Sequence, residues 1–375
     1  MKFTAERGLL LEAVTHLQKV VGSKTSMPVL EGILISAENG KLTLAAYNLE
    51  MGIKKEIYAK CDEQGDIVIN ARLLGDILRK LSGMQVEISA NEKLSCTISC
   101  GEAEFNIMGM AAVDYPEMPS VAEGKKISID SDIFADMVKG TIFSVAPEGG
   151  IRPILTGIQI KIENGILQFV AIDGHRLARR RAKVNIEENI EFIVQGKAVN
   201  ELIKIADENT EKIDILVGKR LVSFNINGYL FITRLLEGEY VNSDKLIPEE
   251  YIQRVFLKRN EIIESVERIS LLINDSLSTP LRFAFSEDNA IISSATSHGR
   301  AKENFTLRLE GEDFEIGLNS RYLLDALKSS DAERLIIRFN GLNSGVVIID
   351  ENEKNDDFLY LIMPMRMSSN VVSKD

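Results

Sequence analysis

The chain has 375 residues and a formal net charge of −12, with 45% hydrophobic and 27% charged residues. This length favours two to four domains, each able to bury an apolar core and stay in solution. No apolar stretch approaches the roughly 20 residues of a membrane-spanning helix, and an amino terminus with Glu6 and Glu12 does not fit a signal peptide. The three cysteines, Cys61, Cys96 and Cys100, lack a C-x-x-C spacing, so we expect reduced thiols in a cytoplasmic protein.

The predicted elements repeat in the same order three times along the chain. Each copy begins with a short strand, which we predict at Lys2–Thr4, Lys126–Ile129 and Arg254–Leu257. An amphipathic helix follows, because apolar residues recur at every third and fourth position. We predict these helices at Arg7–Val21, Ser131–Val145 and Arg259–Ile273.

A turn motif then fixes the period of the repeat. The segment Pro28–Ile33 is matched by Pro153–Ile158, 125 positions later, and a Glu-Asn-Gly turn begins ten residues after each proline, at 38–40 and 163–165. Asn-Gly between apolar runs is a strong hairpin signal, because both residues tolerate positive φ. The third copy is weaker and runs from Thr279-Pro280 into Glu287–Ala290.

A second helix gives an independent landmark with the same spacing. We predict it at Ala71–Leu78, Gly196–Ile203 and Ser320–Leu327, each with a base at the second position and an acid at the sixth. Further strand pairs follow, predicted at Val86–Ser89 with Leu94–Ser99 and at Lys212–Val217 with Leu221–Ile226. Two landmarks that share one offset indicate a true internal repeat.

The repeat predicts an α+β fold of three tandem modules. Pro, Gly or charge interrupts the periodic runs at Ser120–Lys126 and Pro248–Ile252. We therefore expect modules at residues 1–122, 126–248 and 251–375, each with two helices packed on antiparallel sheets. No low-complexity linker separates them, which favours rigid packing.

The sequence shows no motif for catalysis, a metal or a cofactor. His16, His175 and His298 lack metal-ligand spacing, and neither a phosphate-binding P-loop nor a G-x-S-x-G elbow occurs. We interpret Asp173–Arg176 as a tight turn with Gly174 at positive φ, in preference to a reactive site. An enzyme that uses Asp and Glu side chains stays open, because such enzymes have no strong local signature.

At this point the chain resembles the bacterial DNA polymerase III beta subunit family, the sliding clamps. The matching residues span the whole chain: Met1–Thr4, Asn48–Met51, Asp114–Pro116, Asp173–Ala178 and Met363–Met367. The resemblance implies that two chains form a head-to-tail homodimeric ring of six modules around duplex DNA, with helices lining the hole. The implied function is to hold the replicative polymerase on DNA without catalysis and without a cofactor.

The family resemblance also implies a DNA-facing surface inside the ring. The negative net charge argues against ordinary DNA affinity, but a ring holds DNA by topology and needs little of it. Our candidates for phosphate contact are Lys24, Arg72, Arg79, Lys80, Arg152 and Lys197. The basic run at residues 176–183 has two open interpretations, solvated charges near module contacts or DNA binding.

A second implied site is a groove in which polymerase, clamp loader and repair proteins insert a short peptide. The matching positions in the second module and its connector are Leu155, Ile172, Gly174, His175, Arg176, Leu177, Val241, Lys245 and Leu246. Those in the third module are Tyr322, Asn343, Leu361, Met363, Pro364, Met365 and Arg366. Methionine, leucine and proline suit an adaptable apolar groove. The family usually has Pro at the position of Val241 and often Arg at that of Lys245.

The dimer contact would join the first module of one chain to the third module of another. Phe105 and Ile107 match one side of it, and Leu271 and Leu272 match the other, although all four could equally be ordinary core residues. A DNA-encircling clamp is thus the leading hypothesis. A protein-interaction scaffold with no role on DNA is the alternative.

Overall fold

We describe the chain from a computed structural model that covers residues 1–22, 26–207, 209–273, 279–352 and 357–367. Within these residues the chain forms two compact units, Met1–Phe134 with Lys197–Leu235, and Ala135–Gly196 with Leu236–Asp375. No helix among the described residues is long and apolar enough to cross a membrane.

The helices and strands follow the order that the repeat predicts. The helices are α1 (Arg7–Leu17), α2 (Ala71–Lys80), α3 (Ser131–Lys139), α4 (Gly196–Leu202), α5 (Arg259–Ser270) and α6 (Ser320–Lys328). The strands up to the middle of the chain are β1 (Lys2–Glu6), β2 (Gly32–Glu38), β3 (Lys41–Tyr47), β4 (Met51–Tyr58), β5 (Lys60–Glu63), β6 (Gly65–Asn70), β7 (Gln85–Ala90), β8 (Ser95–Cys100), β9 (Ala103–Met108), β10 (Lys125–Asp130), β11 (Gly157–Glu163), β12 (Ile166–Ile172) and β13 (Arg176–Lys183). The remaining strands are β14 (Ile190–Gln195), β15 (Lys212–Val217), β16 (Leu221–Ile226), β17 (Tyr229–Arg234), β18 (Gln253–Lys258), β19 (Leu281–Ser286), β20 (Asn289–Thr296), β21 (Gly299–Thr306), β22 (Arg308–Glu310), β23 (Phe314–Leu318), β24 (Arg334–Phe339), β25 (Val346–Asp350) and β26 (Phe358–Ile362).

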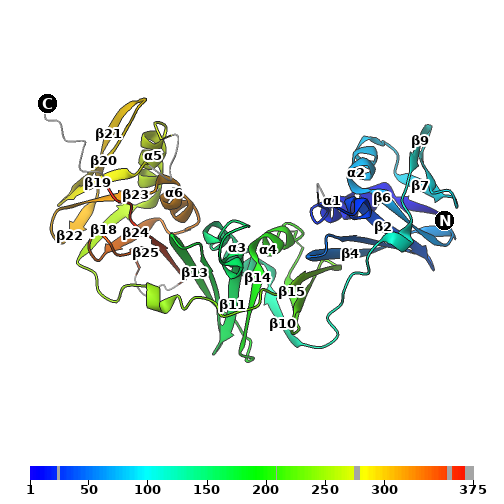
Figure 1. The fold of residues 1–375 in the computed structure, drawn as a ribbon, viewed down its shortest axis with the longest axis horizontal. Coiled ribbons are helices and arrows are strands. Elements are labelled where there is room, and N and C mark those ends of the chain that lie inside the picture. Colours follow the sequence, from blue (N-terminus) through cyan, green and yellow to red (C-terminus); the bar gives the residue numbers. More distant parts are fainter. Residues whose placement is uncertain (23–25, 208, 274–278, 353–356, 368–375) are drawn as a thin grey trace. The chain divides into compact units, whose positions relative to one another are not determined.

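The first unit contains two antiparallel sheets. Their strand orders are β5-β1-β7-β8-β9 and β10-β15-β16-β17-β4-β3-β2-β6. Helices α1 and α2 pack against each other beside these sheets, with α1 in contact with β3 and β4 (Figure 1). The buried face of α1 is Leu10, Ala13, Val14 and Leu17, which is the apolar spacing that predicted this helix.

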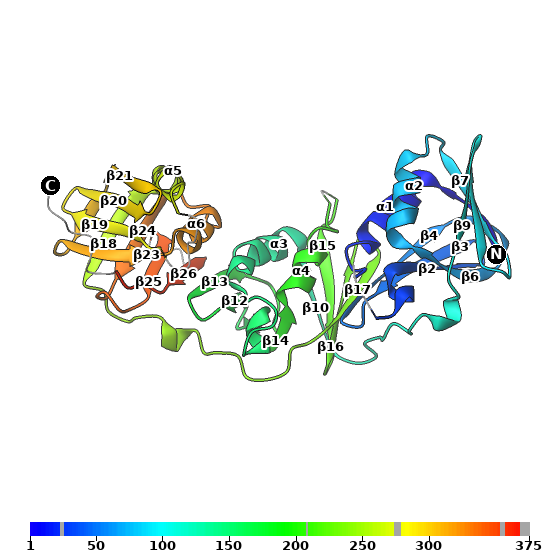
Figure 2. The same cartoon turned by 45° about the horizontal axis from the view of Figure 1, so that its top comes forward.

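The second unit also contains two antiparallel sheets. Their strand orders are β14-β11-β12-β13-β26-β25-β24-β18-β22 and β21-β20-β19-β23. Helices α5 and α6 pack against each other, and α5 also contacts β20 and β21 (Figure 2). The main core of this unit is an apolar cluster that includes Phe283, Phe339 and Tyr360, all nearly or fully buried.

Each long sheet joins strands from two successive modules. In the first unit β17 of the second module pairs with β4 of the first, and in the second unit β26 of the third module pairs with β13 of the second. The second module is therefore divided between the two units, which the sequence repeat did not reveal. Pairing across a module boundary leaves no free strand edge there.

All three predicted hairpins are present, and two of them have the Asn-Gly turn. Asn39 and Gly40 have φ of 52° and 78°, and Asn164 and Gly165 have 52° and 73°, as a type I′ turn requires. In the third copy Ser286 pairs with Asn289, so the turn is Glu287–Asp288 and the asparagine belongs to the following strand. The repeated topology is kept while the turn chemistry changes.

The first helix of each copy is shorter than its apolar pattern predicts. These helices end at Leu17, Lys139 and Ser270, not at Val21, Val145 and Ile273. After the first, Val20 N donates to Leu17 O, and after the third, Ile273 N donates to Ser270 O, so i→i+3 turns replace the α-helix. Periodicity cannot distinguish such a turn from one more helical turn.

Each of the two connectors between modules is attached to a neighbouring module by a hydrogen bond of a buried tyrosine. The hydroxyl of Tyr115 accepts a hydrogen bond from Tyr47 N at 2.8 Å, and burial raises its pKa to about 12. Tyr240, 125 positions later, donates its hydroxyl to Gly157 O at 3.0 Å, and burial raises its pKa too. Both hydroxyls are therefore protonated at neutral pH and lock each connector to its module.

Candidate functional site

A row of apolar residues crosses the nine-stranded sheet where the second and third modules meet. Ile172 lies opposite Leu177, Leu177 opposite Leu361, and Leu361 opposite Val347. Residues directly opposite one another share a face of a sheet. Together with Leu155 they belong to one buried cluster, against which Val241 of the connector packs. Strand register thus brings three of the predicted groove positions together, Ile172, Leu177 and Leu361, and Leu155 and Val241 join them by packing.

The turn Asp173–Arg176 joins β12 to β13 at the end of this row. Gly174 has φ of +93°, a conformation that favours glycine. Oδ1 of Asp173 accepts hydrogen bonds from His175 N at 2.9 Å and Arg176 N at 3.0 Å, which closes the turn. The prediction of a tight turn with glycine at positive φ is confirmed.

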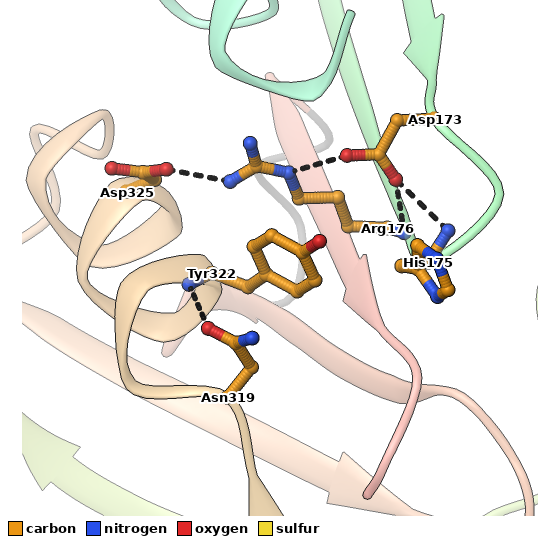
Figure 3. Close-up of polar contacts among 6 residues, drawn as sticks. All are labelled: Asp173, His175, Arg176, Asn319, Tyr322 and Asp325. Atoms are coloured by element: carbon orange, nitrogen blue, oxygen red, sulfur yellow. Dashed lines mark hydrogen bonds and ion pairs between the residues drawn. The ribbon is translucent and has the colours of Figure 1, made fainter. Parts of the chain in front are cut away.

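Arg176 joins this turn to helix α6 of the third module (Figure 3). Its Nε contacts Asp173 Oδ2 at 2.9 Å and its Nη1 contacts Asp325 Oδ2 at 2.6 Å, with only 9% of the arginine side chain exposed. The guanidinium also lies 4.3 Å from the ring centroid of Tyr322. Two ion pairs and a cation–π contact hold the planar group in one orientation.

Tyr322 and His175 complete the cluster. Their rings stack with centroids 6.1 Å apart and planes at 24°, and burial raises the pKa of the Tyr322 hydroxyl. Asn319 caps α6, since its side chain accepts a hydrogen bond from Tyr322 N at 3.1 Å (Figure 3). The cap fixes where Tyr322 and Asp325 leave the helix.

The segment after β26 runs past the turn and is tied at two points. Met363 N donates to His175 O, and Met365 N donates to Gly317 O, both at 2.8 Å. Met363 is 40% exposed, and Pro364 ends the strand because it has no N–H to donate. The predicted tail residues therefore lie against the predicted turn residues and present an exposed methionine there.

The remaining predicted groove residues are more peripheral. Lys245, Asn343 and Arg366 are exposed, and Leu246 is 45% exposed. The Val241 side chain is half-buried in the connector. Lys245, Asn343 and Arg366 are polar or charged, whereas Leu246 and Val241 are apolar.

The basic run on β13 is neither solvated nor open to DNA in its central part. Arg179 and Arg180 are 7% and 6% exposed. Arg179 pairs with Asp244 at 3.2 Å, and Arg180 pairs with Asp136 and also lies near Asp331. Both interpretations drawn from the sequence are thus wrong for these two residues, because buried arginines are kept by nearby carboxylates.

The predicted DNA-facing residues that the structure describes are all exposed. Arg79 contacts Asp76 at 2.6 Å, and Arg72 lies 4.0 Å from the same carboxylate. Lys80, Arg152 and Lys197 are exposed as well, while Lys24 lies outside the described residues. The basic charge of α2 is thus partly offset by its own acid.

The predicted dimer-contact residues lie on exposed parts of two different modules. Phe105 is 36% exposed and Ile107 half-buried on β9, the terminal strand of its sheet. Leu271 is 83% exposed and Leu272 half-buried just after α5. An exposed edge strand with a large apolar side chain is a site for pairing with another chain.

The ion pairs of Asp173 and Asp325 with Arg176 were not predicted from the sequence. The acid at the sixth position of the second helix was visible in every copy, but its partner Arg176 lies 149 residues away. No group of three or more His, Cys, Asp or Glu residues in the described part of the chain is placed to hold a metal ion.

Comparisons with known proteins agree with this architecture along the whole chain. Family models of the DNA polymerase III beta subunit match its N-terminal domain at residues 1–119, its central domain at 128–242 and its C-terminal domain at 244–366. The beta sliding clamp of Bacillus subtilis is 32% identical over 98% of this chain and 100% of the relative.

Solved structures give the same result. The DNA polymerase sliding clamp of Bacillus subtilis superposes with a TM-score of 0.92 at 31% identity, covering 98% of this chain and 100% of that one. The sliding clamp of Pseudomonas aeruginosa bound to griselimycin has a TM-score of 0.89 at 26% identity, with 98% and 100% covered.

Fold and comparisons together define a protein of three tandem clamp domains. The chain belongs to the bacterial DNA polymerase III beta subunit family, whose members are the DNA sliding clamps.

Proposed function

We propose that two copies of this chain close head to tail into a ring around duplex DNA and tether a replicative polymerase to it. The ring is non-catalytic, uses no cofactor and works in the cytoplasm. The domains are those expected from the repeat, 1–122, 126–248 and 251–375. Each chain contributes three, and a ring of six has no free module end.

One observation carries this proposal. The strand pairing that joins two modules occurs twice within the chain, as β4 with β17 and as β13 with β26. The strand of the third module that corresponds to β4 and β13 is β21, and the strand of the first module that corresponds to β17 and β26 is β9. Each of these two strands is the terminal strand of its sheet. A third junction of the same kind needs a second copy.

The helix ends support the same contact. Lys19, just after α1, reaches the second module, where its Nζ donates to Lys204 O at 3.4 Å. The position equivalent to Lys19 after α5 is Leu271, which is 83% exposed. A second copy would cover Leu271 and Leu272 as it covers Phe105 and Ile107.

We further propose that partner proteins dock a short peptide on the surface around Arg176 and the Met363–Met367 tail. The apolar cluster of Leu155, Ile172, Leu177 and Leu361 underlies this surface, and exposed Met363 lies at its edge. Methionine adapts to different partners because its side chain is unbranched and polarizable. We expect griselimycin to bind here, because a related clamp was solved with it.

The oligomeric state is the first test. Light scattering should give a particle of twice the chain mass of 41.7 kDa. A particle of one chain mass at every concentration would contradict the ring.

Griselimycin binding is the test of the docking surface. Met363→Ala should weaken binding about five- to tenfold, because the 40% exposed side chain loses part of the roughly 2 kcal/mol of a buried methionine. Exposed Met84, 83% accessible and outside this surface, gives a matched control in Met84→Ala. An equal loss of griselimycin affinity in the two variants would contradict the proposed docking surface.

We assign the DNA-facing role to Arg72, Arg79, Lys80, Arg152 and Lys197, all exposed, and to Lys24 from the sequence alone. Their contacts would be with phosphates and independent of sequence. Replacing one should lower residual DNA affinity at low salt, while topological retention on circular DNA stays.

A further inference from the structure

The two junctions inside the chain follow one register. At the first, Tyr229 on β17 lies opposite Lys55 on β4, and Leu230 lies opposite Lys54. Lys55 in turn lies opposite Leu44, the fourth residue of β3. The residue opposite the fourth position of the preceding hairpin strand can therefore be used to align one junction with the other.

The second junction repeats this register. Phe358 on β26 lies opposite Arg180 on β13, and Leu359 lies opposite Arg179. Arg180 lies opposite Phe169, again the fourth residue of its strand, β12. Two independent copies of the junction therefore place equivalent residues opposite each other.

The terminal strands β21 and β9 can be aligned with these two junctions in the same way. On β20 the fourth residue is Ile292, and it lies opposite Glu303 on β21, so Glu303 corresponds to Lys55 and Arg180. Strand β9 begins with Ala103 opposite Cys100, as β17 begins with Tyr229 opposite Ile226. Each of these two hairpins has a two-residue turn, so Ala103 corresponds to Tyr229.

We propose that β9 of one copy pairs antiparallel with β21 of a second copy in this register, with Glu104 directly opposite Lys302. This inference rests on the proposed ring and adds the residues that select the partner strand. The pair Glu104–Lys302 would specify head-to-tail closure, and Phe105 would lie opposite Ala301.

The apolar side of the two strands supports this register. Phe105 lies opposite Ile98, which is fully buried, so its ring points to the core side of the sheet although it is 36% exposed. Its counterpart at the first junction, Phe231, is 0% exposed. Ala301 packs against the core of the third module, so the second copy would bury Phe105 in the same way.

The charges explain why each strand selects the other and not itself. Glu104 is the one charged residue of β9, whereas β21 carries Arg300, Lys302 and Glu303 and is net positive. Glu104 and Lys302 are both exposed. Opposite charges stabilise directly paired strands and like charges destabilise them. Pairing of β9 with itself offers Glu104 no base, and pairing of β21 with itself sets two strands of net positive charge beside each other.

A charge exchange tests this code. In Glu104→Lys alone both junctions of the ring carry two lysines, and in Lys302→Glu alone both carry two glutamates. In a mixed ring of one variant with the other, one junction has the native pair and the other has the same pair reversed. We expect each variant alone to dissociate at about tenfold higher concentration than the wild type. The equimolar mixture should restore dimers of mixed composition.

Native mass spectrometry with one variant carrying a mass tag reads out the composition. Glu92→Lys and Lys219→Glu, exposed and outside both strands, are the matched charge controls and should dimerise like the wild type. The register would be overturned, and the ring left in place, if the wild type is a dimer and either single variant dimerises as tightly. The same conclusion would follow if mixing the two variants does not restore dimers. A monomeric wild type would instead overturn the proposed ring.

Discussion

Replacing Arg176 by alanine should strongly destabilise the junction of the second and third modules. The side chain is 9% exposed, and its partner Asp173 is 7% exposed, so this ion pair is buried. Removing one partner of a buried pair costs about 3–5 kcal/mol, because the other charge stays buried. The contact with Asp325 adds less, since a third of that carboxylate is exposed.

Two features set limits on this magnitude. Asp173 keeps two backbone N–H donors in the variant, which lowers the cost, while the loss of the guanidinium over the Tyr322 ring at 4.3 Å raises it by roughly 1 kcal/mol. We therefore expect a loss of about 3–5 kcal/mol in the free energy of unfolding of this part of the chain.

Urea denaturation followed by far-ultraviolet circular dichroism is the assay, because the chain has no tryptophan to report by fluorescence. Arg321→Ala, an exposed arginine on the same helix as Tyr322, is the control and should change stability by less than about 0.5 kcal/mol. A double-mutant cycle of Arg176→Ala with Asp325→Ala should give a coupling of at least about 0.5 kcal/mol. An Arg176→Ala variant as stable as the control would refute the reasoning.

Two further predictions follow from single positions. A Cβ at Gly317 would lie 2.9 Å from both Met365 O and Met367 Cγ, so Gly317→Ala should displace the tail and weaken griselimycin binding while the dimer persists. Gly22→Ala, with nothing within 4 Å, is its control, and equal affinity of the two variants would contradict the role of the tail contact. Burial, together with nearby Lys19, lowers the pKa of His16 below its usual 6.5, so the folded chain favours the neutral ring. The contribution of His16 to the free energy of unfolding should be fully present above pH 6.5 and decrease as the pH drops below it, because the unfolded chain binds the proton more readily. His16→Gln should remove that part of the pH dependence, and identical pH profiles for the variant and the wild type would show that His16 does not contribute.

The sequence predicts the repeat well because each landmark is local. Asn-Gly turns and the apolar spacing of α1 and α2 depend on a few neighbouring residues, and the structure places them as expected. The helix ends after Leu17 and Ser270 were predicted too late, because an i→i+3 turn keeps the same apolar spacing.

The site was predicted less completely because its contacts join distant parts of the chain. Strand register brings Leu177 opposite Leu361, and no local pattern reveals which strands pair. The same register turns Arg179 and Arg180 inward to carboxylates, whereas a basic run read alone predicts an exposed surface. The family resemblance supplied the groove residues, and the structure added Asp173 and Asp325 as the groups that hold Arg176.

Retention on DNA of defined topology tests the central claim most directly. The chain is incubated at high concentration with a closed circular plasmid, so that rings that open can close around it, and is then filtered in high salt to remove electrostatic binding. The ring predicts that protein elutes with the circular plasmid and is lost once a nuclease cuts that plasmid at a single site. Equal retention on the circular and the cut plasmid, or none on either while the protein is dimeric and can open, would contradict encirclement.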